Sequence, residues 1–142
     1  MKRILFFVLL FYSFSINAQD YNYNEWTYVT SSVKDQDYYV RSIDRKKPIK
    51  QFNKISIWTK MVGNTSYWNE KQSKEVFVKD GYTLIKWEFD CKNIEGVMRS
   101  IYTYDSKDNL LYSTDSSFNG EWNSFLPDSV MDEVLNFSCE NY

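Results

Sequence analysis

The chain has 142 residues, with 17 Lys and Arg against 19 Asp and Glu, so its net charge is -2. It contains no histidine, which excludes a Ser/His/Asp or Cys/His nucleophile system and any histidine-based metal site. The acidic balance argues against a nucleic-acid partner, because such proteins need a concentrated positive field to neutralise phosphates.

The N-terminus has the pattern of a secretory signal peptide. Lys2 and Arg3 form the charged start, residues 4–14 form the apolar stretch, and Ala18 is a small residue at the expected cleavage point. The apolar stretch is too short to span a bilayer, and no later segment approaches the roughly 20 apolar residues of a spanning helix. We therefore expect residues 1–18 to be removed and no transmembrane segment to remain.

Removal of this peptide leaves residues 19–142, a length that suits a single domain with one modest core. The remaining 15 basic and 19 acidic residues give a net charge of -4. One local basic run consists of Arg45, Lys46, Lys47 and Lys50. Such a run is better explained as the exposed charges of a connection between strands than as an anion-binding site. We expect an exported protein, placed in the periplasm, at the cell surface or in the medium.

The composition after the signal peptide favours β-strands, because aromatic residues make up 19% of the chain and alternate with polar ones. The strands expected in chain order are 26–30, 38–43, 54–60, 75–79, 83–91, 97–104 and 110–114. Between residues 61 and 79 we expect a long loop that is interrupted only by the short strand at 75–79.

Strand 83–91 has the clearest alternation. Its two faces are Thr83, Ile85, Trp87, Phe89 and Cys91, expected to be buried, and Leu84, Lys86, Glu88 and Asp90, expected to be wet. Strand 97–104 alternates Met98, Ser100, Tyr102 and Tyr104 with Val97, Arg99, Ile101 and Thr103. The short connection predicts an antiparallel hairpin in which Arg99 lies across from Glu88.

From residue 128 to residue 139 the hydrophobic period changes from two to about 3.6 residues, which predicts an amphipathic helix. Its two adjacent apolar rows are Val130, Val134 and Ser138, and Met131, Leu135 and Cys139. Pro127 and Asp128 suit its first turn. The sequence thus predicts an α+β fold, an antiparallel sheet covered on one face by a C-terminal helix.

The chain has two cysteines, Cys91 and Cys139. An even count in an oxidising compartment favours a disulfide. The alternative is a metal or redox pair, for which the chain offers no CxxC motif and no histidine. Because Cys139 continues one helix row and Cys91 ends the apolar strand face, a bridge would hold the helix across that face.

Carboxylate pairs are the remaining route to catalysis. Glu88 and Asp90 lie on one strand face about 7 Å apart, a spacing that acid and base catalysis can use. Their alternation with Lys86 favours an ordinary solvated face, and Asp105 and Asp108 are better explained as turn formers. We therefore expect neither an enzyme nor a cofactor or metal.

Three aromatic residues, Tyr67, Trp68 and Trp122, fall in segments that we expect to be loops. Rings there are not needed for strand packing and could stack on a sugar or a protein surface. The alternative is that they cap the open ends of the sheet core. We take these three residues as the candidate ligand-binding set.

With these elements placed, the chain resembles the surface-adhesin protein E-like family of small exported bacterial proteins over residues 26–139. The matching residues are Trp26, Tyr28, Tyr38, Tyr39, Val40, Ser42, Ile43, Ile57, Trp58, Glu88, Phe89, Asp90, Cys91, Arg99, Ser100, Tyr104, Asp105, Trp122, Pro127, Ser129 and Cys139. The resemblance implies a six-stranded antiparallel sheet with a helix, closed by a Cys91–Cys139 disulfide. It also implies that some relatives attach to host extracellular proteins, and it carries over no binding residue.

Together these observations lead us to expect an exported, non-enzymatic binding module, adhesin-like, that recognises an extracellular protein or glycan through aromatics and the open face of the sheet. The alternative is a periplasmic structural or inhibitory partner of an envelope protein that binds by a sheet edge. A homodimer stays an open option for either function.

Overall fold

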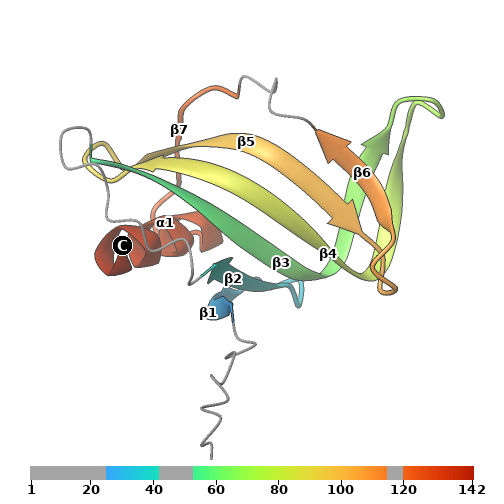
Figure 1. Cartoon of the computed structure of the whole chain (residues 1–142), viewed down its shortest axis with the longest axis horizontal. Coiled ribbons are helices and arrows are strands. Elements are labelled where there is room, and N and C mark those ends of the chain that lie inside the picture. The colour runs from blue at the N-terminus through green and yellow to red at the C-terminus, as the bar shows by residue number, and fades with distance from the viewer. Residues whose placement is uncertain (1–24, 42–52, 115–119) are drawn as a thin grey trace, which may run out of the picture.

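The structure is a computed structural model that describes residues 25–41, 53–114 and 120–142. These residues form a strongly curved, mostly antiparallel sheet with one C-terminal helix (Figure 1). The signal peptide expected at 1–18 and the basic run at 45–50 lie outside the described residues. Within the described ranges, no helix combines the length and the apolar character that crossing a membrane requires.

Six strands follow one another in an antiparallel meander, and each is hydrogen-bonded to the next. They are β1 (Trp26–Ser31), β2 (Asp37–Arg41), β3 (Lys54–Asn69), β4 (Lys74–Asp90), β5 (Glu95–Tyr104) and β6 (Leu110–Thr114). A two-residue strand, β7 (Asn123–Ser124), pairs with the start of β5, and helix α1 (Val130–Asn141) follows. The predicted α+β fold is confirmed, with the short β7 as an addition.

Strands β3 and β4 are much longer than expected, and the loop expected at 61–79 is wrong. β3 continues to Asn69 and β4 begins at Lys74, so the segment is a paired hairpin with a tight turn. Only one face of its distal half is apolar enough to be buried, at Thr65 and Val78, while the other face is exposed. Because so few of its side chains are buried, this hairpin has the polar composition that is otherwise typical of a loop.

Two glycines allow this hairpin to bend. Gly63 and Gly81 lie opposite each other, and the register shifts directly after Gly63. A Cβ at Gly81 would lie 2.5 Å from the backbone oxygen of Tyr104, so only glycine permits this close approach. Figure 1 shows the distal half of β3 and β4 turning away from the rest of the sheet beside β6.

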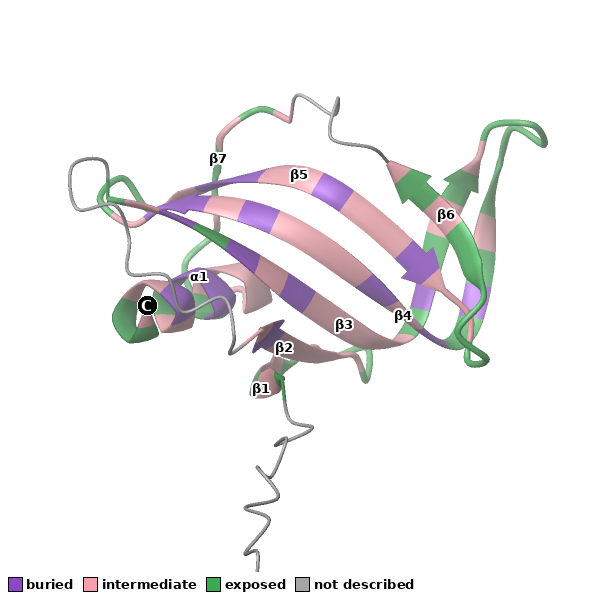
Figure 2. Ribbon diagram, viewed as in Figure 1, coloured by how far each residue is buried: buried purple, intermediate pink, exposed green. Residues whose placement is uncertain are grey.

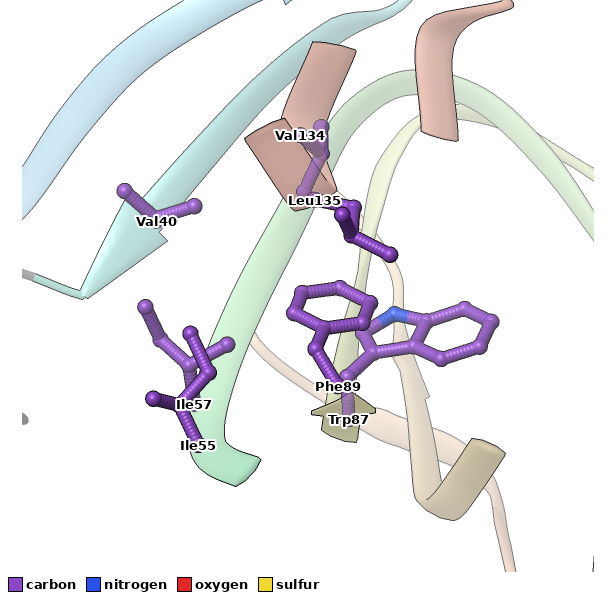
Figure 3. Packing of buried hydrophobic residues seen from close by; sticks show 7 residues of the cluster. All are labelled: Val40, Ile55, Ile57, Trp87, Phe89, Val134 and Leu135. Atoms are coloured by element: carbon purple, nitrogen blue, oxygen red, sulfur yellow. The ribbon is translucent and has the colours of Figure 1, made fainter. Parts of the chain in front are cut away.

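The core lies between the sheet and α1. Its cluster of buried hydrophobic residues comprises Val40, Ile55, Ile57, Trp87, Phe89, Val134 and Leu135. Figure 2 shows the buried residues as separate bands along β3, β4 and β5, as the alternation of side chains in a strand requires. In Figure 3, Val134 and Leu135 of the helix face the aromatic rings of Phe89 and Trp87, which stack 5.7 Å apart.

The helix begins at Val130, two residues later than expected. Ser129 is its N-cap and accepts a hydrogen bond from the backbone N–H of Asp132, which satisfies one of the free donors of the first turn. Pro127 and Asp128 therefore precede the helix, and Asp128 has a positive φ of 61°. The apolar rows are as predicted, since Val134, Leu135 and Ser138 are its buried residues.

The predicted disulfide joins the last turn of the helix to the end of β4. Cys91 and Cys139 are bonded, with their Cα atoms 5.7 Å apart, and they are 48 positions apart in sequence. Among the described residues no cysteine is free. The bridge holds α1 against the apolar sheet face on which Trp87 and Phe89 lie.

Candidate functional site

The candidate site is the sheet face that points away from α1, which we call the open face. It is defined by Trp26, Trp58, Lys60, Tyr82, Lys86, Tyr102 and Tyr104. These residues alternate along their strands with the core residues, so they point to the opposite side of the sheet. All seven are partly exposed. The face therefore carries large aromatic rings and lysines where an ordinary solvated sheet face carries small polar side chains.

The rings of the open face contact one another across strands. Tyr82 of β4 stacks on Tyr104 of β5, with ring centroids 4.8 Å apart and ring planes 13° apart. Trp58 of β3 and Tyr102 of β5 lie 5.9 Å apart in a tilted arrangement. An aromatic pair of this kind contributes about 0.5–1.5 kcal/mol to stability in addition to the burial of its surface area. The rings are therefore held in place without a ligand.

The two lysines of the open face lie over these rings. Lys60 Nζ is 4.4 Å from the ring centroid of Tyr82 and 6.0 Å from that of Trp26. Lys86 Nζ is 5.9 Å from the centroid of Trp58. Within the described part of the chain neither lysine forms a salt bridge. Their charges are thus held by cation–π contacts and stay available to an incoming partner.

Arg99 and Glu88 form the predicted ion pair at one end of this face. Arg99 donates from Nε at 3.0 Å and from Nη2 at 2.8 Å to the same carboxylate oxygen of Glu88. The pairing jumps from Trp87–Met98 to Lys86–Ser100, so Arg99 is the extra residue of a β-bulge. The strict alternation expected for 97–104 is therefore wrong, because the bulge returns Ile101 to the face of Met98.

Tyr82 remains a neutral phenol over the physiological range. Burial, together with a 3.0 Å hydrogen bond from its hydroxyl to Asp108 Oδ1 and the nearby negative charges, raises the pKa of Tyr82 to about 12. The hydroxyl is thus occupied at the β5–β6 turn, and the ring is the part of Tyr82 that meets Lys60. The open face accordingly combines neutral rings with positive charge.

The carboxylate pair of β4 has a structural explanation. Asp90 is only 9% exposed, so the expectation of a solvated side chain is wrong for this residue. It accepts hydrogen bonds from the backbone N–H groups of Lys92 and Asn93 and from the Asn93 side chain, and so closes the β4–β5 turn. Burial raises the pKa of Asp90, but these hydrogen bonds outweigh it and hold the pKa below the usual range.

The acidic residues between β5 and β6 form a turn, as expected. Asp105 accepts hydrogen bonds from the backbone of Lys107 and from the backbone and side chain of Asn109. The bonds from Asn109 lower the pKa of Asp105. Asp108 has a positive φ of 63°, which a turn aspartate tolerates.

The structure does not bring the three candidate ligand-binding aromatics together. Tyr67 and Trp68 lie in β3, so the loop expectation is wrong for both, and as neighbours in a strand they point to opposite faces. Tyr67 stacks on Tyr112 at 5.6 Å, whereas Trp68 is 56% exposed. Trp122 lies at the far end of β3, with Lys54 Nζ 4.4 Å from its ring centroid.

Sequence reasoning missed Phe77, whose side chain is 69% exposed on β4. It shares a hairpin face with Trp68, because Ser66 pairs with Phe77 and Trp68 pairs with Glu75. The alternation of Val76, Phe77 and Val78 within the expected strand 75–79 held the signal, since burial of Val78 turns Phe77 outward. The segment before it was expected to be a loop, so its pairing with the distal half of β3 was not predicted.

Comparison with known structures supports the expected fold. The chain is similar to Haemophilus influenzae protein E with a TM-score of 0.54 and 12% sequence identity, and the match covers 83% of this chain and 86% of that one. At this identity the likeness shows a shared fold, so it supports the resemblance seen in the sequence at the level of architecture. No protein-family model and no curated protein matches the sequence.

Proposed function

We propose that the protein is an exported, non-enzymatic binding module that recognises an extracellular protein or glycan through its open face. The observation that carries the proposal is the set of aromatic rings on the sheet face opposite α1, together with lysines that form no salt bridge among the described residues. Aromatic residues dominate the high-affinity positions of protein interfaces, and rings can also stack on sugars. A rigid platform loses little entropy when a partner binds.

Rigidity comes from three independent constraints. The rings stack across β3, β4 and β5, the Arg99–Glu88 pair fixes the bulge, and the disulfide ties α1 to the end of β4. Trp122, packed over Lys54, would extend the open face at the start of β3. We include Trp122 in the contact surface and assign Tyr67 a structural role, because its ring is stacked on Tyr112.

Export is supported by the disulfide, because such bonds persist in oxidising compartments and are rare in the cytosol. The signal-peptide pattern and the family resemblance, in which some relatives attach to host extracellular proteins, point in the same direction. The fold likeness to protein E agrees with this function. These observations support a place in the periplasm, on the cell surface or in the medium.

The second candidate is a periplasmic partner that binds by a sheet edge. The observation in its favour is β6, which pairs with β5 on one side and ends the order of the sheet. β6 carries no charged residue, and its Leu110 and Leu111 are 52% and 37% exposed. Edges that avoid pairing usually carry a charge or a proline, so β6 could accept an added strand.

Protease treatment of intact bacterial cells that produce the full chain separates the two candidates. The extracellular module should be cleaved on intact cells or recovered intact from the medium, while a periplasmic marker stays protected. Cleavage only after the outer envelope has been opened would overturn the extracellular function and select the edge-binding candidate.

A further inference from the structure

We propose a second ligand site, separate from the open face, that binds a neutral oligosaccharide. It is a groove of about 570 Å³ between the β1–β2 turn and the outer face of the β3–β4 hairpin. The residues that matter for its chemistry are Lys34, Gln36, Asn64, Ser66, Glu75 and Phe77. Its volume is typical of a site for a small ligand.

The floor of the groove is preorganised by Gln36. Its side-chain amide donates to the backbone oxygen of Asn64 at 2.5 Å, which ties the β1–β2 turn to the point where β3 bends. Its amide oxygen accepts from Ser32 and Tyr38, each at 3.3 Å. The Asn64 side chain in turn accepts from the backbone N–H of Asp80 at 3.2 Å. The two walls are therefore held at a fixed separation without a ligand.

The hairpin wall presents exposed aromatic surface. Phe77 is 69% exposed and lines the groove, and Trp68 is 56% exposed on the same hairpin face. Between them Ser66 donates to Glu75 Oε1 at 2.5 Å, which fixes the carboxylate beside the rings. A pyranose ring has an apolar C–H face and a rim of hydroxyls, so it can stack on the rings and bond to the polar groups.

The charge of the groove lining favours a neutral sugar over an ionic ligand. Lys34 and Glu75 carry opposite charges at the same groove, so the charge of the lining is balanced and offers an ionic glycan no excess of opposite charge.

The experiment titrates the full exported chain with chitotetraose, cellotetraose and maltotetraose at millimolar concentration, followed by NMR of the tryptophan indole and backbone N–H groups. A heparin tetrasaccharide serves as the anionic comparator. We expect at least one neutral tetrasaccharide to shift the Trp68 indole signal selectively. The double variant W68A/F77A should weaken that binding by roughly tenfold or more, as measured on the backbone signals of the groove. Both side chains are exposed, so the fold should tolerate their removal.

One control variant tests whether the sugar binds at this groove. Leu126→Ala removes a side chain that is 79% exposed elsewhere and should bind sugar like the wild type. Binding is followed on the signals of the groove alone, so failure of the open-face function would leave this result intact. Absence of a shift with all three neutral sugars, binding of the heparin fragment alone, or unchanged affinity in W68A/F77A would overturn the proposal.

Discussion

Gly63 lies directly opposite Gly81 in the β3–β4 hairpin, and at this pair the two long strands bend out of the main sheet. The added Cβ of Gly63→Ala would lie 2.8 Å from the backbone oxygen of Asp35, and that of Gly81→Ala would lie 2.5 Å from the backbone oxygen of Tyr104. Gly63 also has a φ of 130°, which other residues rarely adopt. The bend thus depends on both positions.

Gly81→Ala should destabilise the protein by about 1–3 kcal/mol, because the backbone must shift to admit the methyl group. Thermal unfolding followed by circular dichroism measures the change. Lys79→Ala, an exposed position two residues earlier in the same strand, is the control and should unfold like the wild type. Equal melting temperatures for the two variants would show that the close approach at Gly81 is not there.

Removal of the disulfide by the double variant C91S/C139S should lower the free energy of unfolding by about 4 kcal/mol, since the bond closes a loop of 48 positions. Urea unfolding measures this loss, and wild-type protein in a reducing agent should match the double variant. The intact protein should not react with a thiol reagent before it unfolds. Early reaction, or a loss below about 1 kcal/mol, would contradict the role of the bridge.

Asp90 should make the free energy of unfolding depend on pH in the acid range. Its pKa in the folded protein lies below the unfolded value of about 3.9, so its stabilising effect is complete above about pH 4 and is lost as the pH falls through the folded pKa. Asp90→Asn should therefore be less stable than the wild type by about 1–2 kcal/mol at neutral pH. The difference should shrink in acid.

Urea unfolding of the wild type and Asp90→Asn at neutral pH and at successively lower pH tests this dependence. Glu121→Gln, an exposed carboxylate outside the turns, is the control and should not alter the pH profile. If the free energies of unfolding of the wild type and Asp90→Asn differed by the same amount at every pH, the charge of Asp90 would not be the source of its stabilising effect.

Where the sequence pattern reports burial directly, the fold was predictable. Alternation located the apolar face of β4, the helical rows located Val134 and Leu135, and the two cysteines formed the expected bridge. These signals are strong because one face of each element is buried in the core. The helix begins later than expected because Ser129 has the extended backbone of an N-cap, whereas Asp128 before it has a positive φ of 61°.

The distal hairpin and the bulge were not predictable for a common reason. Each depends on a contact between strands: Gly81 meets the backbone of Tyr104, and Arg99 is displaced from the register to reach Glu88. The sequence of one strand does not show which residues of the neighbouring strand it pairs with. The open-face residues Trp58 and Tyr102 were visible as alternating aromatics, but only the pairing of β3, β4 and β5 placed their rings within 5.9 Å.

The most direct test of the open-face function compares the wild type with the variant Tyr102→Ala/Lys86→Glu for binding to a decellularised fibroblast extracellular matrix. Lys107→Glu, an exposed lysine in the β5–β6 turn, is the matched charge control, and circular dichroism confirms that all three are folded. Protease or glycosidase treatment of the matrix then separates a protein ligand from a glycan. We expect saturable binding by wild type and Lys107→Glu and a loss of roughly tenfold or more in the open-face variant. No binding by the wild type, or equal binding by all three, would show that the open face is not the binding surface for such a ligand.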